Sequence, residues 1–74
     1  MGIRQIFGAN LKKLRRSRGL SQEELAYRAG IDRTYVSALE RGVYSATIDV
    51  VERIAKVLKI EVAELLRSPD RPNK

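Results

Sequence analysis

The chain contains no cysteine and no histidine among its 74 residues. Disulfides and thiolate metal sites are therefore excluded, and the nucleophile–base pairs of most hydrolases lack their commonest members. The acidic residues are scattered, without the spacing of a metal site. These absences predict a protein that is not an enzyme and that needs neither a metal nor any other cofactor.

No apolar run approaches the length of a membrane span or of a signal-peptide core. We therefore expect a cytoplasmic protein with no membrane partner. Proline is scarce as well, and both prolines lie in the last six residues, at Pro69 and Pro72. This distribution predicts one small domain over residues 1–68, followed by a flexible polar tail over residues 69–74.

Basic residues are abundant by comparison: 15 lysines and arginines stand against 9 acidic residues, for a net charge of +6. Such a balance favours a polyanionic partner such as nucleic acid. The imbalance is sharpest near the beginning of the chain, where every charged side chain of residues 3–18 is basic: Arg4, Lys12, Lys13, Arg15, Arg16 and Arg18. We expect this segment to help attract DNA, although a solvated helix face is the simpler explanation of a charge run.

Apolar residues recur at helical spacing along the whole chain, and no strand pattern is present, so the expected fold class is all-α. N-cap residues and terminating glycines predict five helices, over residues 3–18, 22–29, 33–41, a segment that follows Thr47, and 62–67. Gly8 inside the first helix indicates close packing against another backbone. The fourth helix should present one core stripe, formed by Ile48, Val51, Ile54, Ala55 and Leu58.

The stretch SQEELAYRAGIDRTYVSALER, residues 21–41, combines two short helices with a distinctive set of residues. Ala26 leaves room for a close helix crossing, Gly30 suits the turn, and Val36 fills the angle between the helices. At these offsets the three residues resemble the helix-turn-helix of DNA-binding proteins, whose second helix lies in the major groove. The alternative is an ordinary helical hairpin that only packs.

The segments LKKLRRSRGLSQEELAYRAGIDRTYVSALERG and TIDVVERIAKVLKIEVAELL resemble the phage-repressor and Cro-like (XRE-type) helix-turn-helix family. The resemblance implies a compact five-helix, lambda-repressor-like domain whose second and third helices form the motif. It also implies a transcription regulator that binds double-stranded operator DNA sequence-specifically, in bacteria or phage and at the nucleoid. Such domains usually bind palindromic operators as homodimers.

Within that family, a stand-alone domain containing DRTYVS and ERG is similar to the controller proteins of restriction-modification systems. A phage-type repressor remains an alternative, as does an antitoxin or adaptor module whose helix-turn-helix serves mainly protein contacts.

Roles of single residues follow from the resemblance and from side-chain chemistry. An arginine can bond both O6 and N7 of guanine. Arg33 stands near a helix N-terminus, where the helix dipole disfavours a cation, and this favours a ligand contact over a stabilising role; the alternative is a solvated surface arginine. The expected base contacts are Arg33, Thr34 and Ala38. The expected phosphate contacts are Gln22, Tyr35, Ser37, Arg41, Tyr44 and Arg15.

Three further expectations concern protein contacts. The resemblance implies a structural ion pair between Arg15 and Glu40. Apolar residues left over from the core predict a homodimer interface, formed by Val50, Val57, Val62 and Leu66; the alternative is that some of them complete a small core. Glu23, which has no capping role, is the candidate contact to RNA polymerase if the protein activates transcription.

Overall fold

The structure, a computed structural model, describes residues 2–68. In that range the chain forms five helices and no strand: α1 (Ile3–Ser17), α2 (Gln22–Ala29), α3 (Arg33–Glu40), α4 (Ile48–Leu58) and α5 (Val62–Leu66). The all-α prediction is confirmed, and the helices begin at the expected residues. The tail predicted over residues 69–74 lies outside the described residues.

Side-chain caps explain why three of these helices begin where they do. Oγ of Ser21 accepts a hydrogen bond from the Glu24 amide at 3.0 Å, and the Glu24 carboxylate accepts one from the Ser21 amide at 3.2 Å. Asp32 accepts from the Thr34 amide and Thr47 from the Val50 amide, at 3.4 and 3.1 Å. Such caps satisfy backbone donors that have no partner inside the helix.

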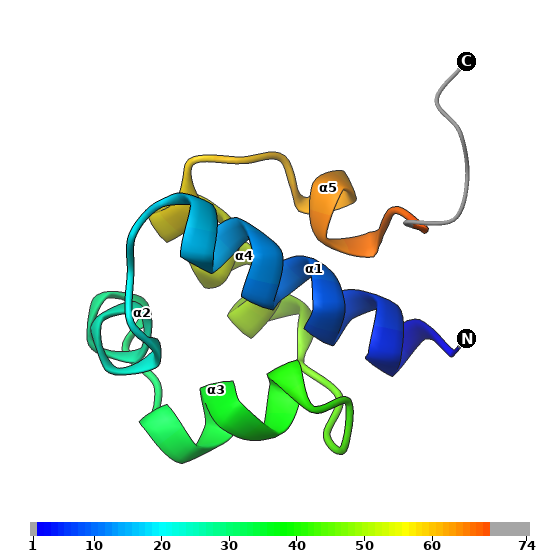
Figure 1. Cartoon of the computed structure of the whole chain (residues 1–74), viewed down its shortest axis with the longest axis horizontal. Coiled ribbons are helices and arrows are strands. Elements are labelled where there is room, and N and C mark those ends of the chain that lie inside the picture. Colours follow the sequence, from blue (N-terminus) through cyan, green and yellow to red (C-terminus); the bar gives the residue numbers. More distant parts are fainter. Residues whose placement is uncertain (1, 69–74) are drawn as a thin grey trace.

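The helices enclose one core, with α1 crossing the middle of the domain (Figure 1). α1 contacts α3 and α5, while α2 contacts α3 and α4. Each helix contributes at least one side chain with almost no exposed surface: Leu11, Leu25, Val36, Leu39, Ile54, Leu58 and Leu65. Burying one such side chain stabilises the fold by about 1.5–3 kcal/mol. The core thus fixes α3 against α1, and α2 against α3 and α4.

Gly8 brings the middle of α1 against the C-terminal end of α3. A Cβ atom at this position would overlap the carbonyl oxygen of Leu39 and would lie 2.7 Å from the carbonyl oxygen of Glu40. The close backbone contact predicted at Gly8 is therefore confirmed. It sets the depth at which α3 sits on α1.

Two polar side chains, one in α1 and one directly after it, hold the ends of other helices. Nδ2 of Asn10 donates to the carbonyl oxygens of Leu65 and Arg67, at 2.9 and 2.8 Å. Nε of Arg18 donates to the carbonyl oxygen of Leu58 at 2.8 Å. Carbonyls at helix C-termini otherwise lack partners. Arg18, expected among the charges that attract DNA, is thus committed to the end of α4.

One member of the expected core stripe is misplaced. Ile48 is 86% exposed, whereas Ile54, Ala55 and Leu58 are buried. Ile48 is the first residue of α4 and lies outside the core that the later turns of the helix cover. The helical period alone therefore did not reveal its exposure.

No helix within residues 2–68 combines the length and apolarity that a membrane crossing requires.

Candidate nucleic-acid interface

The turn between α2 and α3 is held by local hydrogen bonds. Gly30 ends α2 in the left-handed conformation, with φ of 70°. The amide of Ile31 then donates to the carbonyl oxygen of Ala26 at 2.9 Å, which closes the end of α2. Ala26 and Val36 are 3% and 0% exposed, so the small residue and the branched residue fill the angle between the helices. This packing leaves the outer face of α3 exposed to solvent.

The first turn of α3 is exposed. Arg33 and Thr34 lie on the surface, at the end of α3 that follows the turn. Ser37, one turn along the helix, is half-buried, and Arg41 is exposed directly after the helix ends. Together these four residues place two guanidinium groups and two hydroxyl groups, all able to form hydrogen bonds, along α3 and directly after its end.

Tyr35 and Tyr44 join α3 to the loop that follows it. Their ring centroids lie 6.4 Å apart and their planes are inclined at 57°, within the range of favourable aromatic pairs. The Tyr35 hydroxyl donates a long hydrogen bond of 3.4 Å to the carbonyl oxygen of Ser45. The pair therefore holds the loop beside α3, with Tyr44 60% exposed.

Ala38 forms the floor of an open hollow on this face, whose walls include Thr34, Tyr35, Arg41 and Tyr44. Its exposure is only 6%, and the Val43 amide of the following loop donates to its carbonyl oxygen at 3.1 Å. This placement speaks against the expected base contact by Ala38. Of the residues around the hollow, Thr34, Arg41 and Tyr44 are exposed.

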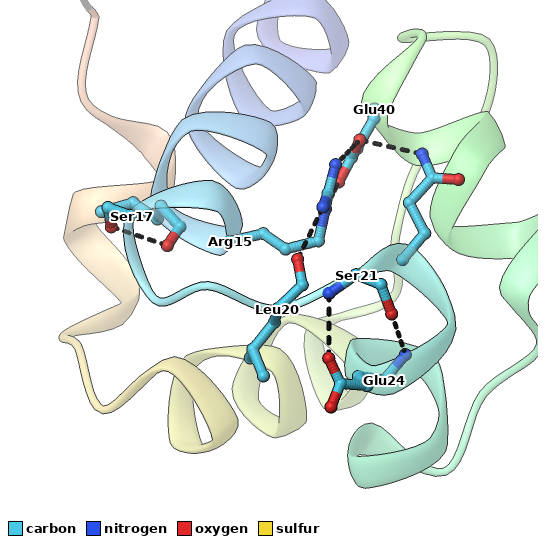
Figure 2. A network of polar contacts seen from close by, with 8 residues as sticks. Arg15, Ser17, Leu20, Ser21, Glu24 and Glu40 are labelled. Carbon is cyan, nitrogen blue, oxygen red and sulfur yellow. Dashed lines mark hydrogen bonds and ion pairs between the residues drawn. The ribbon is translucent and has the colours of Figure 1, made fainter.

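The expected ion pair between Arg15 and Glu40 is present, and it is buried. Nε and Nη2 of Arg15 donate to Oε2 and Oε1 of Glu40 at 2.6 and 3.1 Å, as the dashed lines of Figure 2 show. Nη1 of Arg15 donates to the carbonyl oxygen of Leu20 at 2.7 Å. Arg15 is 8% exposed, so its burial and these bonds speak against the expected phosphate contact. Its role is to fix α3 to α1.

Gln22 belongs to the same network, which the sequence did not reveal. Its Nε2 donates to Oε1 of Glu40 at 3.0 Å. Gln22 is the first residue of α2 and is half-buried. The network therefore joins α1, the beginning of α2 and the end of α3. No spacing rule indicates this contact, because the two residues are brought together only by the crossing of the helices.

The outer face of α2 carries acidic and aromatic groups. Glu23 is exposed and Tyr27 is 88% exposed. With Glu24 and Arg28 they surround an open hollow. Glu24 is already engaged with Ser21 in the helix cap, so Glu23 and Tyr27 are the groups on this face that a partner would meet first.

The residues expected to form a dimer interface separate into two pairs. Val50 and Val57 are partly buried against the core, which supports the alternative that they complete it. Val62 and Leu66 of α5 are 39% and 43% exposed. Leu66 also lines an apolar hollow of about 120 Å³, together with Ile3. Ile3 is 59% exposed, and the sequence did not indicate it as a surface residue.

Comparisons with known proteins agree with this geometry. The helix-turn-helix family model (HTH_3) matches residues 11–65. Control protein C.BamHI of Bacillus amyloliquefaciens is 38% identical over 65 residues, covering 86% of this chain and 80% of that protein.

Solved structures of DNA-binding regulators are similar to this chain as well. The restriction-modification controller protein C.AhdI of Aeromonas hydrophila has a TM-score of 0.82 and 42% identity, over 84% of this chain and 94% of the other. A structure of the biofilm regulator SinR in complex with DNA has a TM-score of 0.79 and 34% identity, over 82% and 98% of the two chains. The match to the family model spans most of the chain and contains the whole α2–turn–α3 unit, and the chain belongs to the helix-turn-helix family.

Proposed function

We propose that this chain is a DNA-binding transcription regulator that binds a palindromic operator as a homodimer. The observation that carries the proposal is the exposed first turn of α3, which the buried Ala26–Val36 contact and the Gly30 turn hold away from the core. A helix presented in this way fits the major groove of DNA. The net charge of +6 favours the same partner.

Base recognition is assigned to Arg33 and Thr34. Arg33 has the length and planar donors for a bidentate contact to guanine, and one such contact discriminates by about 1–3 kcal/mol. Thr34 offers a hydroxyl group and a methyl group to neighbouring bases. Ala38, expected earlier as a third base contact, contributes the floor of the hollow beside them.

Backbone contacts are assigned to residues that frame α3. The helix N-terminus at Gln22 favours an anion, and the exposed Arg41 and Tyr44 border the other end of α3. Ser37 and the Tyr35 hydroxyl lie between them. Phosphate contacts of this kind position the protein without reading sequence. The exposed Lys12, Lys13 and Arg16 of α1 add attraction that depends on salt.

The homodimer is assigned to the exposed apolar residues of α5 and their neighbour on α1, namely Val62, Leu66 and Ile3. Dimers of this class place two recognition helices about one helical turn of DNA apart, roughly 34 Å. Small domains bury a limited fraction of their surface, so an apolar patch at this position gains stability from a second copy.

The narrower assignment is to the controllers of restriction-modification operons. Two of the similar proteins described above are controllers, and a regulator of this kind works in the cytoplasm at the nucleoid. Activation would require a contact to RNA polymerase, for which we propose the outer face of α2 with Glu23 and Tyr27. The exposure of both residues supports this assignment.

The proposal is tested by selecting duplexes from a random DNA pool at a fixed salt concentration and sequencing them. We expect an inverted repeat whose half-sites lie about ten base pairs apart. Repeating the selection with Arg33→Ala should relax one position in each half-site. Enrichment of no motif, together with binding that is lost at moderate salt, would contradict the proposal and leave only attraction by charge.

A further inference from the structure

The buried carboxylate of Glu40 holds a second partner besides Arg15. Its Oε1 accepts hydrogen bonds from Nη2 of Arg15 at 3.1 Å and from Nε2 of Gln22 at 3.0 Å. The Glu40 side chain is 4% exposed, whereas Gln22 is half-buried and reaches the surface. Glu40 therefore connects a buried ion pair to a side chain at the edge of the DNA-facing surface.

The Gln22 amide can serve two acceptors at once. An amide nitrogen of this type carries two hydrogens, and the bond to Glu40 uses one of them. Gln22 is also the first residue of α2, where backbone amides lack partners within the helix and the helix dipole favours an anion. The second hydrogen and the backbone amides can therefore bind the same phosphate group.

We propose that Glu40 is a positioning residue for DNA binding, which holds the Gln22 amide in the orientation that a phosphate at the N-terminus of α2 requires. This inference rests on the proposed function, because it places a DNA phosphate at that terminus. A long side chain normally loses rotamer freedom when it binds a partner. The bond to Glu40 removes that freedom before DNA arrives.

Arg15 makes this arrangement compatible with a phosphate. A lone carboxylate close to the DNA backbone would repel it, but the two hydrogen bonds from Arg15 pair the Glu40 charge. The ion pair thus has two consequences: it fixes α3 to α1, and it allows a carboxylate to orient a phosphate-binding amide.

The test is a double-mutant cycle on the affinity of the full chain for a duplex that carries the selected inverted repeat. We expect Gln22→Ala and Glu40→Met, which removes the acceptor for the Gln22 amide, each to weaken binding about 5- to 10-fold, with tenfold corresponding to about 1.4 kcal/mol. The double variant should bind no more weakly than Gln22→Ala alone, because Glu40 acts through Gln22. Gln5→Ala, which changes an exposed glutamine of α1, is the matched control and should bind like the wild type.

The outcomes separate this inference from the proposed function. Losses that multiply in the double variant would overturn the positioning role and leave Glu40 with a role in the fold alone. Wild-type affinity of Gln22→Ala would overturn it too, while sequence-specific binding that depends on Arg33 would keep the regulator proposal intact. If the wild-type chain selects no motif, the proposed function fails and the positioning role fails with it.

A second measurement covers the case in which Glu40→Met does not fold, since that substitution leaves the buried Arg15 charge without its partner. The order parameter of the Gln22 side-chain amide is measured by NMR in the wild-type chain without DNA. We expect it to approach the value of rigid backbone, about 0.85, while exposed Gln5 falls below about 0.6. Equal mobility of the two amides would overturn the proposal.

Discussion

Replacement of Gly8 by alanine decides between two opposing effects on the stability of the domain. Alanine is the better helix former by about 1 kcal/mol, so helix propensity alone predicts a more stable protein. Against this, the added methyl group would lie 2.7 Å from the carbonyl oxygen of Glu40 and still closer to that of Leu39. Both atoms belong to the backbone of α3 and cannot turn aside as a flexible side chain would.

The magnitudes favour destabilisation. Overpacking in a core costs about 1–3 kcal/mol, and contact with two backbone atoms belongs at the upper end of that range. After the gain in helix propensity, we expect Gly8→Ala to lower the free energy of unfolding by about 2 kcal/mol. For a domain of this size the melting temperature falls by about 4–8 °C per kcal/mol, and therefore by about 8–16 °C.

Thermal unfolding followed by circular dichroism measures this effect directly. Ala9→Gly is the matched control, because Ala9 is the exposed neighbour of Gly8 on α1. It should lose about 1 kcal/mol through helix propensity alone. A Gly8→Ala protein that melts at or above the wild-type temperature would refute the close contact between α1 and α3.

Three other substitutions test the ion pair, a helix end and the α2 surface. Glu40→Ala leaves Arg15 charged and buried, which should lower the free energy of unfolding by about 3–5 kcal/mol; normal urea unfolding would show that the pair contributes little. Lys59→Gly should raise the free energy of unfolding by up to about 1 kcal/mol, since Lys59 ends α4 in the left-handed conformation, with a φ of 58°. An unchanged urea midpoint would argue against backbone strain at Lys59. Glu23→Ala should bind the operator normally and lose activation in a transcription assay with RNA polymerase, and full activation would remove Glu23 from that role.

Local features of the sequence were sufficient to place the helices. Ser21, Asp32 and Thr47 act as caps within three residues of their partners, so short-range chemistry determines where helices begin. Gly8 was informative for a related reason: a glycine inside a helix weakens it, and its presence there indicated close packing against another backbone, which the structure identifies as that of α3.

Contacts that depend on how the helices cross could not be predicted from local features of the sequence. The bond between Gln22 and Glu40 joins residues 18 positions apart, and the Asn10 bonds to α5 span 55 and 57 positions. The burial of Ala38 and the exposure of Ile48 depend on where the loop and the core end. Their surroundings are set by tertiary packing, about which helical periodicity carries no information.

We propose above that α3 reads bases in the major groove through Arg33. This proposal is tested most directly by replacing one guanine of each selected half-site with 7-deazaguanine, which removes the N7 acceptor of the major groove. The affinity of the wild type and of Arg33→Ala is then measured for both duplexes. At the guanine whose position Arg33→Ala relaxes, we expect the replacement to weaken binding of the wild type and to leave the affinity of Arg33→Ala unchanged. Equal losses for the two proteins at every guanine would contradict the claim that Arg33 makes this contact.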